Sequence, residues 1–147
     1  MVRSHSQANT YTGDTTITAG EVILTGTLNS LTDLNIDNDA ILDLRSAQTV
    51  ATLVLDGTIE NGDTDATNSS LTVSGASTLD GSITTDGNQT YAAITLAEDT
   101  TLTGGSQLTV GGTLDGTKTL QTNFTESELM GKLVAQLHSV QSISMVI

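Results

Sequence analysis

Carboxylates are the side chains of this sequence that are best suited to chemistry, and one arginine lies among them. Glycan-cleaving sites use clustered carboxylates, often beside a cation. Between residues 30 and 117, Arg45 is the only basic side chain, and the acidic residues are Asp33, Asp37, Asp39, Asp43, Asp56, Glu60, Asp63, Asp65, Asp80, Asp86, Glu98, Asp99 and Asp115. Most of them stand at turns, where Asp bonds its own backbone. We therefore predict no catalytic residues and no enzyme activity.

Two short acidic segments place hard oxygen ligands close together, as a calcium site requires. They are Asp37-Asn38-Asp39 and Asp63-Thr64-Asp65. Neither matches an EF-hand loop, and the glycine-rich repeat of calcium β-rolls is absent. The prediction is an acidic turn and an acidic loop, with no metal site and no cofactor.

Two Thr-x-Thr segments carry the pattern that an ice-binding face needs in rows. Thr16-Ile17-Thr18 and Thr101-Leu102-Thr103 each put two hydroxyls on one side of a strand, ~6.6 Å apart. Asn35, Asp43 and Val54 interrupt comparable positions between them. A flat, continuous threonine face would favour ice binding, and the sequence does not predict one here.

The composition excludes several classes of partner. The formal net charge is -13, with only four basic side chains, whereas nucleic-acid binding needs clustered Lys and Arg. The same shortage argues against anionic membrane surfaces. No apolar run is long enough to span a bilayer, so we expect no membrane insertion by this segment. With aromatic residues at 2% and no cysteine, the core must be thin and aliphatic, without disulfides.

Internal repetition is the strongest structural signal in the 147 residues. The segment 48–55 (QTVATLVL) returns as 89–96 (QTYAAITL), and 16–20 (TITAG) returns as 101–105 (TLTGG). Further copies relate 26–28 to 112–114, 70–73 with 78–81 to 107–110 with 113–116, and, more faintly, 34–36 with 39–42 to 94–96 with 99–102. One supersecondary unit stacked on itself explains such copies.

The spacing of the copies favours a solenoid over a sandwich of hairpins. Short runs with every second residue apolar alternate with Gly, Asn and Asp turns, which is typical of strands with one buried face. Steps of about 19 and 41 residues separate equivalent leucines, in line with a ~20-residue coil. We predict an all-β fold, a parallel β-helix of about five coils. Its inward stack is Leu34, Ile36, Leu53, Leu55, Ile94 and Leu96.

Two segments depart from the repeat. We interpret 56–70 as a loop that bulges from one coil, because 60–68 has no apolar side chain larger than Ala66. Residues 125–128 (TESE) fit a capping box, and one helical stripe follows, made of Leu129, Met130, Leu133, Val134, Leu137 and Val140. The divisions are a loose segment at 1–9, repeats at 10–121 and a tail at 122–147. The tail is either a C-terminal capping helix or foreign to the fold.

The segment 10–24 (TYTGDTTITAGEVIL) resembles the Tyr-Thr-Gly repeat of autotransporter passenger domains, from which it departs at Glu21. The stretch 82–116 is similar to repeats of filamentous-haemagglutinin-type secreted adhesins. The resemblance covers about three quarters of the chain. It implies a right-handed parallel β-helix, export across a Gram-negative outer membrane and an extracellular or cell-surface location. A longer parent protein is also implied, with a signal sequence upstream and, in autotransporters, a membrane barrel downstream.

The expected function is a structural, non-enzymatic segment of a secreted or surface-exposed passenger or adhesin. Its stiff rod would contact host or neighbouring cells through a surface receptor, a glycan or another copy of itself. A carbohydrate-active β-helix enzyme is the first alternative, which carboxylates gathered around Arg45 would favour. An ice-binding solenoid is the second.

Overall fold

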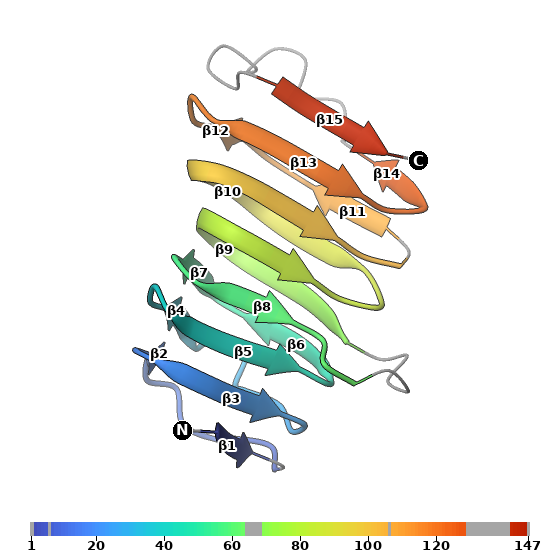
Figure 1. Cartoon of the computed structure of the whole chain (residues 1–147). Helices are drawn as coiled ribbons and strands as arrows, with labels where there is room; N and C mark the ends of the chain where they lie inside the picture. Colours follow the sequence, from blue (N-terminus) through green and yellow to red (C-terminus); the bar gives the residue numbers. More distant parts are fainter. Residues whose placement is uncertain (1, 6, 64–68, 106, 129–141, 147) are drawn as a thin grey trace.

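Parallel strands are stacked coil upon coil, as the computed structural model shows in Figure 1. The structure describes residues 2–5, 7–63, 69–105, 107–128 and 142–146. Over these residues the chain is all-β and winds into a parallel β-solenoid of about five coils, which confirms the predicted fold class. The two termini lie at opposite ends of the stack (Figure 1).

Each complete coil contributes strands to three faces, which we name after one member strand. The β7 face consists of β2 (Thr15–Ile17), β4 (Asp33–Ile36), β7 (Thr52–Leu55), the middle of β9 (Ser70–Thr84) and β10 (Gln89–Thr103), and β12 (Leu114–Asp115). The β6 face consists of β6 (Ala47–Val50), the starts of β9 and β10, β11 (Gln107–Val110) and β14 (Glu126–Glu128).

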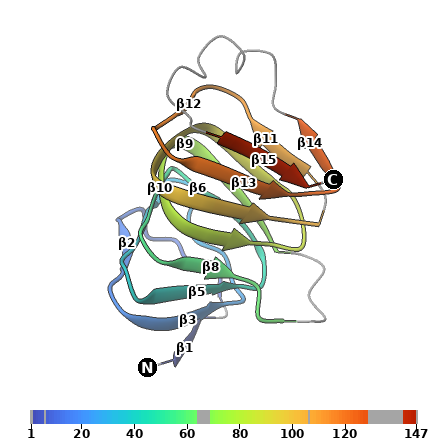
Figure 2. The same ribbon diagram turned by 45° about the horizontal axis from the view of Figure 1, so that its top comes forward.

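The β5 face is the longest ladder. It contains β1 (Val2–His5), β3 (Gly20–Leu24), β5 (Ala40–Leu44), β8 (Thr58–Glu60), the ends of β9 and β10, β13 (Thr119–Asn123) and β15 (Ser142–Val146). Figure 2, in which the stack is tilted, shows β9 and β10 curving from one face into the next.

The core is a narrow column of aliphatic side chains, as the low aromatic content predicted. Leu34 pairs with Leu53, and Leu53 and Ile94 both pair with Ser77. The neighbouring inward row runs through Ile17, Ile36, Leu55, Leu79 and Leu96. All six residues of the predicted stack are at most 3% exposed, so the predicted inward orientation and register are confirmed.

Tight corners between faces depend on residues that accept close backbone contact. Gly81 has a φ of 130°, and a Cβ at this position would lie 2.3 Å from the carbonyl oxygen of Gly57. Gly116 has a φ of 118° at the equivalent corner of a later coil. Glycine is the residue that adopts such a φ without steric cost, so these two positions fix where the chain turns.

The predicted loop at 56–70 begins later than expected. Thr58–Glu60 is strand β8, and the side chain of Ile59 is fully buried in the core. The alternation of Thr58, Ile59 and Glu60 is only three residues long, too short to be recognised as a strand in the sequence. The insertion therefore starts at Asn61, and 64–68 lie outside the described residues.

The ladder also crosses the predicted boundary at residue 121. β13 extends to Asn123, and Glu126–Glu128 forms β14, which pairs with β11. The capping box expected at 125–128 is therefore wrong, because Thr-Glu-Ser-Glu occupies an extended ladder position instead of a helix start. The predicted helical stripe, Leu129 to Val140, lies outside the described residues.

Candidate functional site

One row of threonines runs along the outside of the β6 face. The register pairs Thr49 with Thr72, Thr72 with Thr90, and Thr90 with Thr109. Side chains alternate across a strand, and the flanking residues of each threonine point inward and are buried. These flanking residues are Gln48, Val50, Leu71, Val73, Gln89, Tyr91, Leu108 and Val110. The four threonines thus form a continuous outward row with coils ~4.8 Å apart.

The positions on both sides of this threonine row are small or uncharged. They are Ala47, Ser70, Asn88 and Gln107 on one side and Ala51, Ser74, Ala92 and Gly111 on the other. No charged side chain occurs at 47–51, 70–74, 88–92 or 107–111, although the chain has 17 acidic residues. We call these eight positions, together with the four threonines, the neutral surface.

Carboxylates gather instead at the corner that joins the β7 face to the β5 face. The acidic residues between these faces in successive coils are Asp37, Asp39, Asp56, Asp80, Glu98 and Asp99. Lys118 forms an ion pair with Glu98, and the hydrogen bond between them raises the pKa of Lys118 above its ordinary value. The neutral surface thus lies apart from this acidic corner, and it ends at β14, where Glu126 pairs with Gln107 and Glu128 pairs with Thr109.

The two Thr-x-Thr segments of the sequence do not share a face. Thr16 is on the β7 face, in a row that continues through Asn35 and Val54. Thr101 is on the β5 face, where it pairs with Ser82 and Gln121. From the sequence they were treated as copies with comparable positions between them, which is wrong because the same alternation fits a strand on any face. The interruption predicted at Asn35 and Val54 is real for the Thr16 row.

The interior behind the neutral surface contains amides that bond across the core. Gln89 donates from Nε2 to the carbonyl oxygen of Thr103 at 2.9 Å and to Thr85 Oγ1 at 3.2 Å. Its Oε1 accepts the hydroxyl of Tyr91 at 2.9 Å, and burial raises the pKa of that phenol far above its ordinary value.

Gln48 occupies the same inward row two coils earlier. Its Nε2 donates to the carbonyl oxygen of Gly26 at 2.7 Å, and its Oε1 accepts the backbone N–H of Leu28 at 2.8 Å. Two buried glutamines therefore tie strands of the β6 face to neighbouring backbone. The sequence repeat at 48–55 and 89–96 showed that Gln48 and Gln89 are equivalent positions. It did not indicate that their amides would be buried or which backbone groups they would bond.

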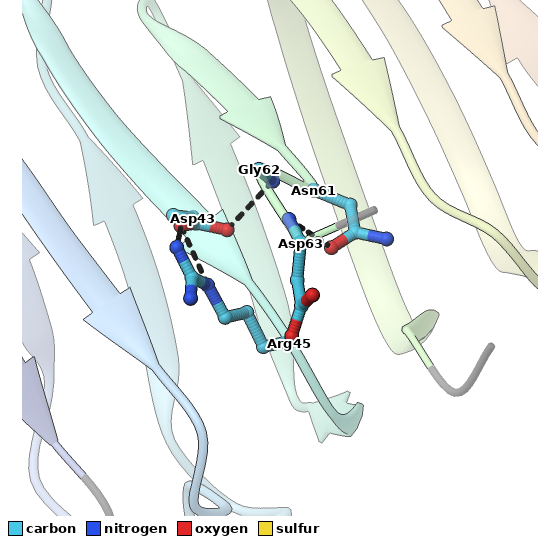
Figure 3. Close-up of polar contacts among 5 residues, drawn as sticks. All are labelled: Asp43, Arg45, Asn61, Gly62 and Asp63. Atoms are coloured by element: carbon cyan, nitrogen blue, oxygen red, sulfur yellow. Dashed lines mark hydrogen bonds and ion pairs between the residues drawn. The ribbon is translucent and has the colours of Figure 1, made fainter. Parts of the chain in front are cut away.

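Arg45 is engaged by a buried carboxylate (Figure 3). Its Nε donates to Asp43 Oδ2 at 2.8 Å, and its pKa is raised, mainly by this hydrogen bonding. Asp43 is 1% exposed, and its Oδ1 accepts the backbone N–H of Gly62 at 2.9 Å. Both carboxylate oxygens are thus occupied. The contacts fasten the start of the insertion to β5, which is a structural role for the cation that the sequence singled out.

The two acidic segments considered for calcium lie apart in the fold. Asp39 lines a shallow hollow of about 490 Å³ together with Asn38, Asp56, Gly57 and Gly81. Asp63 follows β8 on another corner, and Thr64 and Asp65 lie outside the described residues. Within the described part of the chain, no group of three or more acidic or histidine side chains is arranged to hold a metal ion.

Comparison with protein-family models, with curated proteins and with solved structures gave no match. In the part of the chain that the structure covers, no helix is long and apolar enough to cross a membrane. The functional argument therefore depends on the chain's own surfaces, and the neutral surface is the one whose chemistry repeats from coil to coil.

Proposed function

We propose that this chain is a non-enzymatic structural segment of a secreted or surface-exposed bacterial passenger or adhesin. The neutral surface is its contact face. The observation that carries the proposal is the uninterrupted row Thr49, Thr72, Thr90 and Thr109 on a continuous parallel ladder. The Tyr-Thr-Gly resemblance at 10–24 supports the location outside a Gram-negative cell.

Charge indicates how such a rod makes contact. A net charge of -13 keeps copies apart and repels anionic surfaces within a Debye length of ~8–10 Å. The neutral surface can approach a partner without desolvating a carboxylate, a step that would cost free energy. Hydroxyl and methyl groups on every threonine suit an uncharged, hydroxyl-rich partner, and a surface glycan has that chemistry.

Two double variants test the contact face. Thr72→Lys with Thr90→Lys puts two cations on the neutral surface, and Thr78→Lys with Thr95→Lys puts two on the β7 face of the same strands. Beads coated with each chain are counted on epithelial and bacterial cells, with and without periodate oxidation of the cell glycans. The proposal expects wild-type adhesion that periodate removes. It expects adhesion to be lost in the first double variant and retained in the second, with similar melting temperatures. Equal adhesion of all three chains would contradict it.

The threonine row favours one second function, an ice-binding solenoid. A flat, continuous row of threonines was the feature that would favour it, and the row exists on the β6 face instead of at Thr16 or Thr101. Thermal hysteresis and ice-crystal shape are measured for the same three chains. Ice binding predicts crystal shaping by the wild type that only the Thr72 and Thr90 replacements remove. A wild-type chain without hysteresis excludes it.

A further inference from the structure

Asn61 and Gly62 form the one Asn-Gly pair in the sequence, and they stand where the insertion leaves β8. In such a pair the backbone nitrogen of the glycine can attack the side-chain carbonyl carbon of the asparagine, since no Cβ on the following residue hinders the approach. Gly62 is exposed. Water can therefore reach the dipeptide, and the outcome depends on how the fold holds the two reacting groups.

The side-chain amide of Asn61 is held at both of its polar atoms. Nδ2 donates to a carboxylate oxygen of Asp86, and Oδ1 accepts the backbone N–H of Asp63 at 3.2 Å. Asp86 is itself fixed to the coil, because its backbone N–H donates to Ser69 Oγ at 2.9 Å. The adjacent Gly87 N–H donates to the carbonyl oxygen of Ser69 at 2.8 Å. Rotation of the amide toward Gly62 must break the bond to Asp86.

The attacking nitrogen is held as well. The Gly62 N–H donates to Asp43 Oδ1 at 2.9 Å, and Asp43 is kept in place by Arg45 (Figure 3). A Cβ added to Gly62 would lie 3.0 Å from Asp43 Oδ2, so the backbone sits tightly against this carboxylate. Both reaction partners are consequently anchored to different carboxylates, Asp86 for the amide and Asp43 for the nitrogen.

We propose that Asn61 is a site of spontaneous deamidation whose rate in the folded chain is restrained by Asp86 and Asp43. In the step, the Gly62 nitrogen loses its proton to solvent base and forms a bond to Asn61 Cγ. The bond from Cγ to Nδ2 breaks, and ammonia leaves with a proton from water. Water then opens the cyclic imide to aspartate or isoaspartate. No oxidant, reductant or cofactor takes part.

The product changes the contact that restrained the reaction. An amide that donated to Asp86 becomes a carboxylate that faces it, and the two negative charges repel each other. The formal net charge of the chain moves from -13 by one further negative charge, to -14. The hydrogen bond between Asn61 and Asp86 is then lost, and with it the side-chain link between the end of β8 and the corner at 85–87. Deamidation is therefore a slow covalent modification that loosens this corner. The inference is independent of the proposed contact face.

The experiment follows deamidation of the full chain at neutral pH by peptide mapping and mass spectrometry. The native chain is compared with the chain unfolded in urea, and with the native variants Asp86→Ala and Asp80→Ala. Both variants remove one carboxylate, but only Asp86 contacts Asn61. Gly62→Ala serves to show that the mass gain depends on this dipeptide.

We expect conversion at Asn61 in urea and much slower conversion in the native chain. Asp86→Ala should accelerate the native reaction roughly tenfold, the equivalent of one hydrogen bond to a charged group. Asp80→Ala should leave it unchanged, and Gly62→Ala should slow it strongly in the native and the unfolded chain. If Asp86→Ala is unfolded, Asp86→Ser, which also removes the carboxylate that holds the Asn61 amide, replaces it, with the same acceleration expected. Equal rates in the native and unfolded chains, or in all folded variants, would overturn the proposal.

Discussion

The β6 face and the β7 face are built from the same long strands, β9 and β10, yet they distribute polar groups in opposite ways. Inside the β7 face the buried rows are leucine and isoleucine, apart from Ser77, whereas the β6 face buries Gln48, Gln89 and the hydroxyl of Tyr91. Outside, one row of the β7 face changes at almost every coil, through Thr16, Asn35, Val54, Thr78, Thr95 and Asp115. The corresponding row of the β6 face stays threonine over four coils before it reaches Glu128 in β14.

This difference distinguishes the residue repetition that folding requires from the repetition that folding does not require. Inward repetition follows from stacking, because each coil buries its side chains against the previous one. Outward repetition has no such cause, since the β7 face folds with Thr, Asn, Val and Asp in one row. The uniform threonine row is therefore the part of the molecule that packing alone leaves unexplained, and it is where we place the contact.

The largest expected effect is on the inward row of the β7 face. Leu55→Ala should lower the free energy of unfolding by ~2–5 kcal/mol, because it leaves a cavity between Ile36 and Leu79. Val54→Ala, on the outside of the same strand, should change it by less than ~0.5 kcal/mol. Urea unfolding measures both. Similar losses for the two variants would mean that burial does not separate the two rows.

Gln89 tests whether the amides inside the β6 face are structural. Gln89→Leu keeps a similar size but leaves the Thr103 carbonyl and the Tyr91 hydroxyl without this partner. The free energy of unfolding should fall by ~1–3 kcal/mol. The exposed control Gln121→Leu should be close to neutral. An increase in stability for Gln89→Leu in urea unfolding would show that an apolar interior serves this face equally well.

Alkaline pH should act on the β6 face through Tyr91. Its pKa is raised by burial from an ordinary value of 10.0, so above that pH the unfolded chain loses the proton and the folded chain keeps it. The contribution of Tyr91 to the free energy of unfolding is therefore complete below pH 10.0. Above pH 10.0 it decreases by ~1.4 kcal/mol for each pH unit. Tyr91→Phe should flatten this slope, and Tyr11→Phe, at an exposed site, should not. Identical slopes in thermal unfolding at high pH would contradict the assignment.

The smallest effect concerns Ser77, a buried polar residue in the stack of the β7 face. The Ser77 hydroxyl is buried between Leu53 and Ile94, and the structure gives it no hydrogen-bond partner. Ser77→Ala should raise the free energy of unfolding by up to about 1 kcal/mol, since it removes an unsatisfied group. Ser74→Ala is the control, because that hydroxyl bonds the carbonyl of Val50 and points outward. A destabilised Ser77→Ala chain would indicate that the hydroxyl has a partner after all.

The sequence predicted the solenoid because its coil length and inward residues repeat. The copies at 48–55 and 89–96 are two coils apart in space. Leu71 and Leu108, which stand in the copies at 70–73 and 107–110, are also two coils apart, because both pair with Gln89. The faint copy of 34–42 at 94–102 is also structural, with Leu42, Ile59, Ile83 and Leu102 in one row. Apolar alternation is enforced by burial, which is why it can be read from the residues.

Exterior rows could not be predicted in the same way. Thr49, Thr72, Thr90 and Thr109 are separated by 23, 18 and 19 residues, because the insertion after β8 lengthens one coil. The segments 16–20 and 101–105 are more alike in sequence than the segments around these four threonines, yet the two belong to different faces. Period-two alternation is identical on all faces, and only the register against neighbouring coils distinguishes them. The contacts of Asp43 with Gly62 and of Asn61 with Asp86 likewise join residues that the sequence separates by 19 and 25 positions.

The most direct test of the contact face uses the absence of cysteine from the chain. Thr90→Cys and Thr95→Cys place single thiols on the outside of the same strand, β10, the first on the neutral surface and the second on the β7 face. Each is labelled with a bulky maleimide, and adhesion of coated beads to cells is compared with that of the unlabelled variant. The account predicts that the label at residue 90 abolishes adhesion and the label at residue 95 leaves it intact. Loss with the label at 95 and retention at 90 would contradict the account.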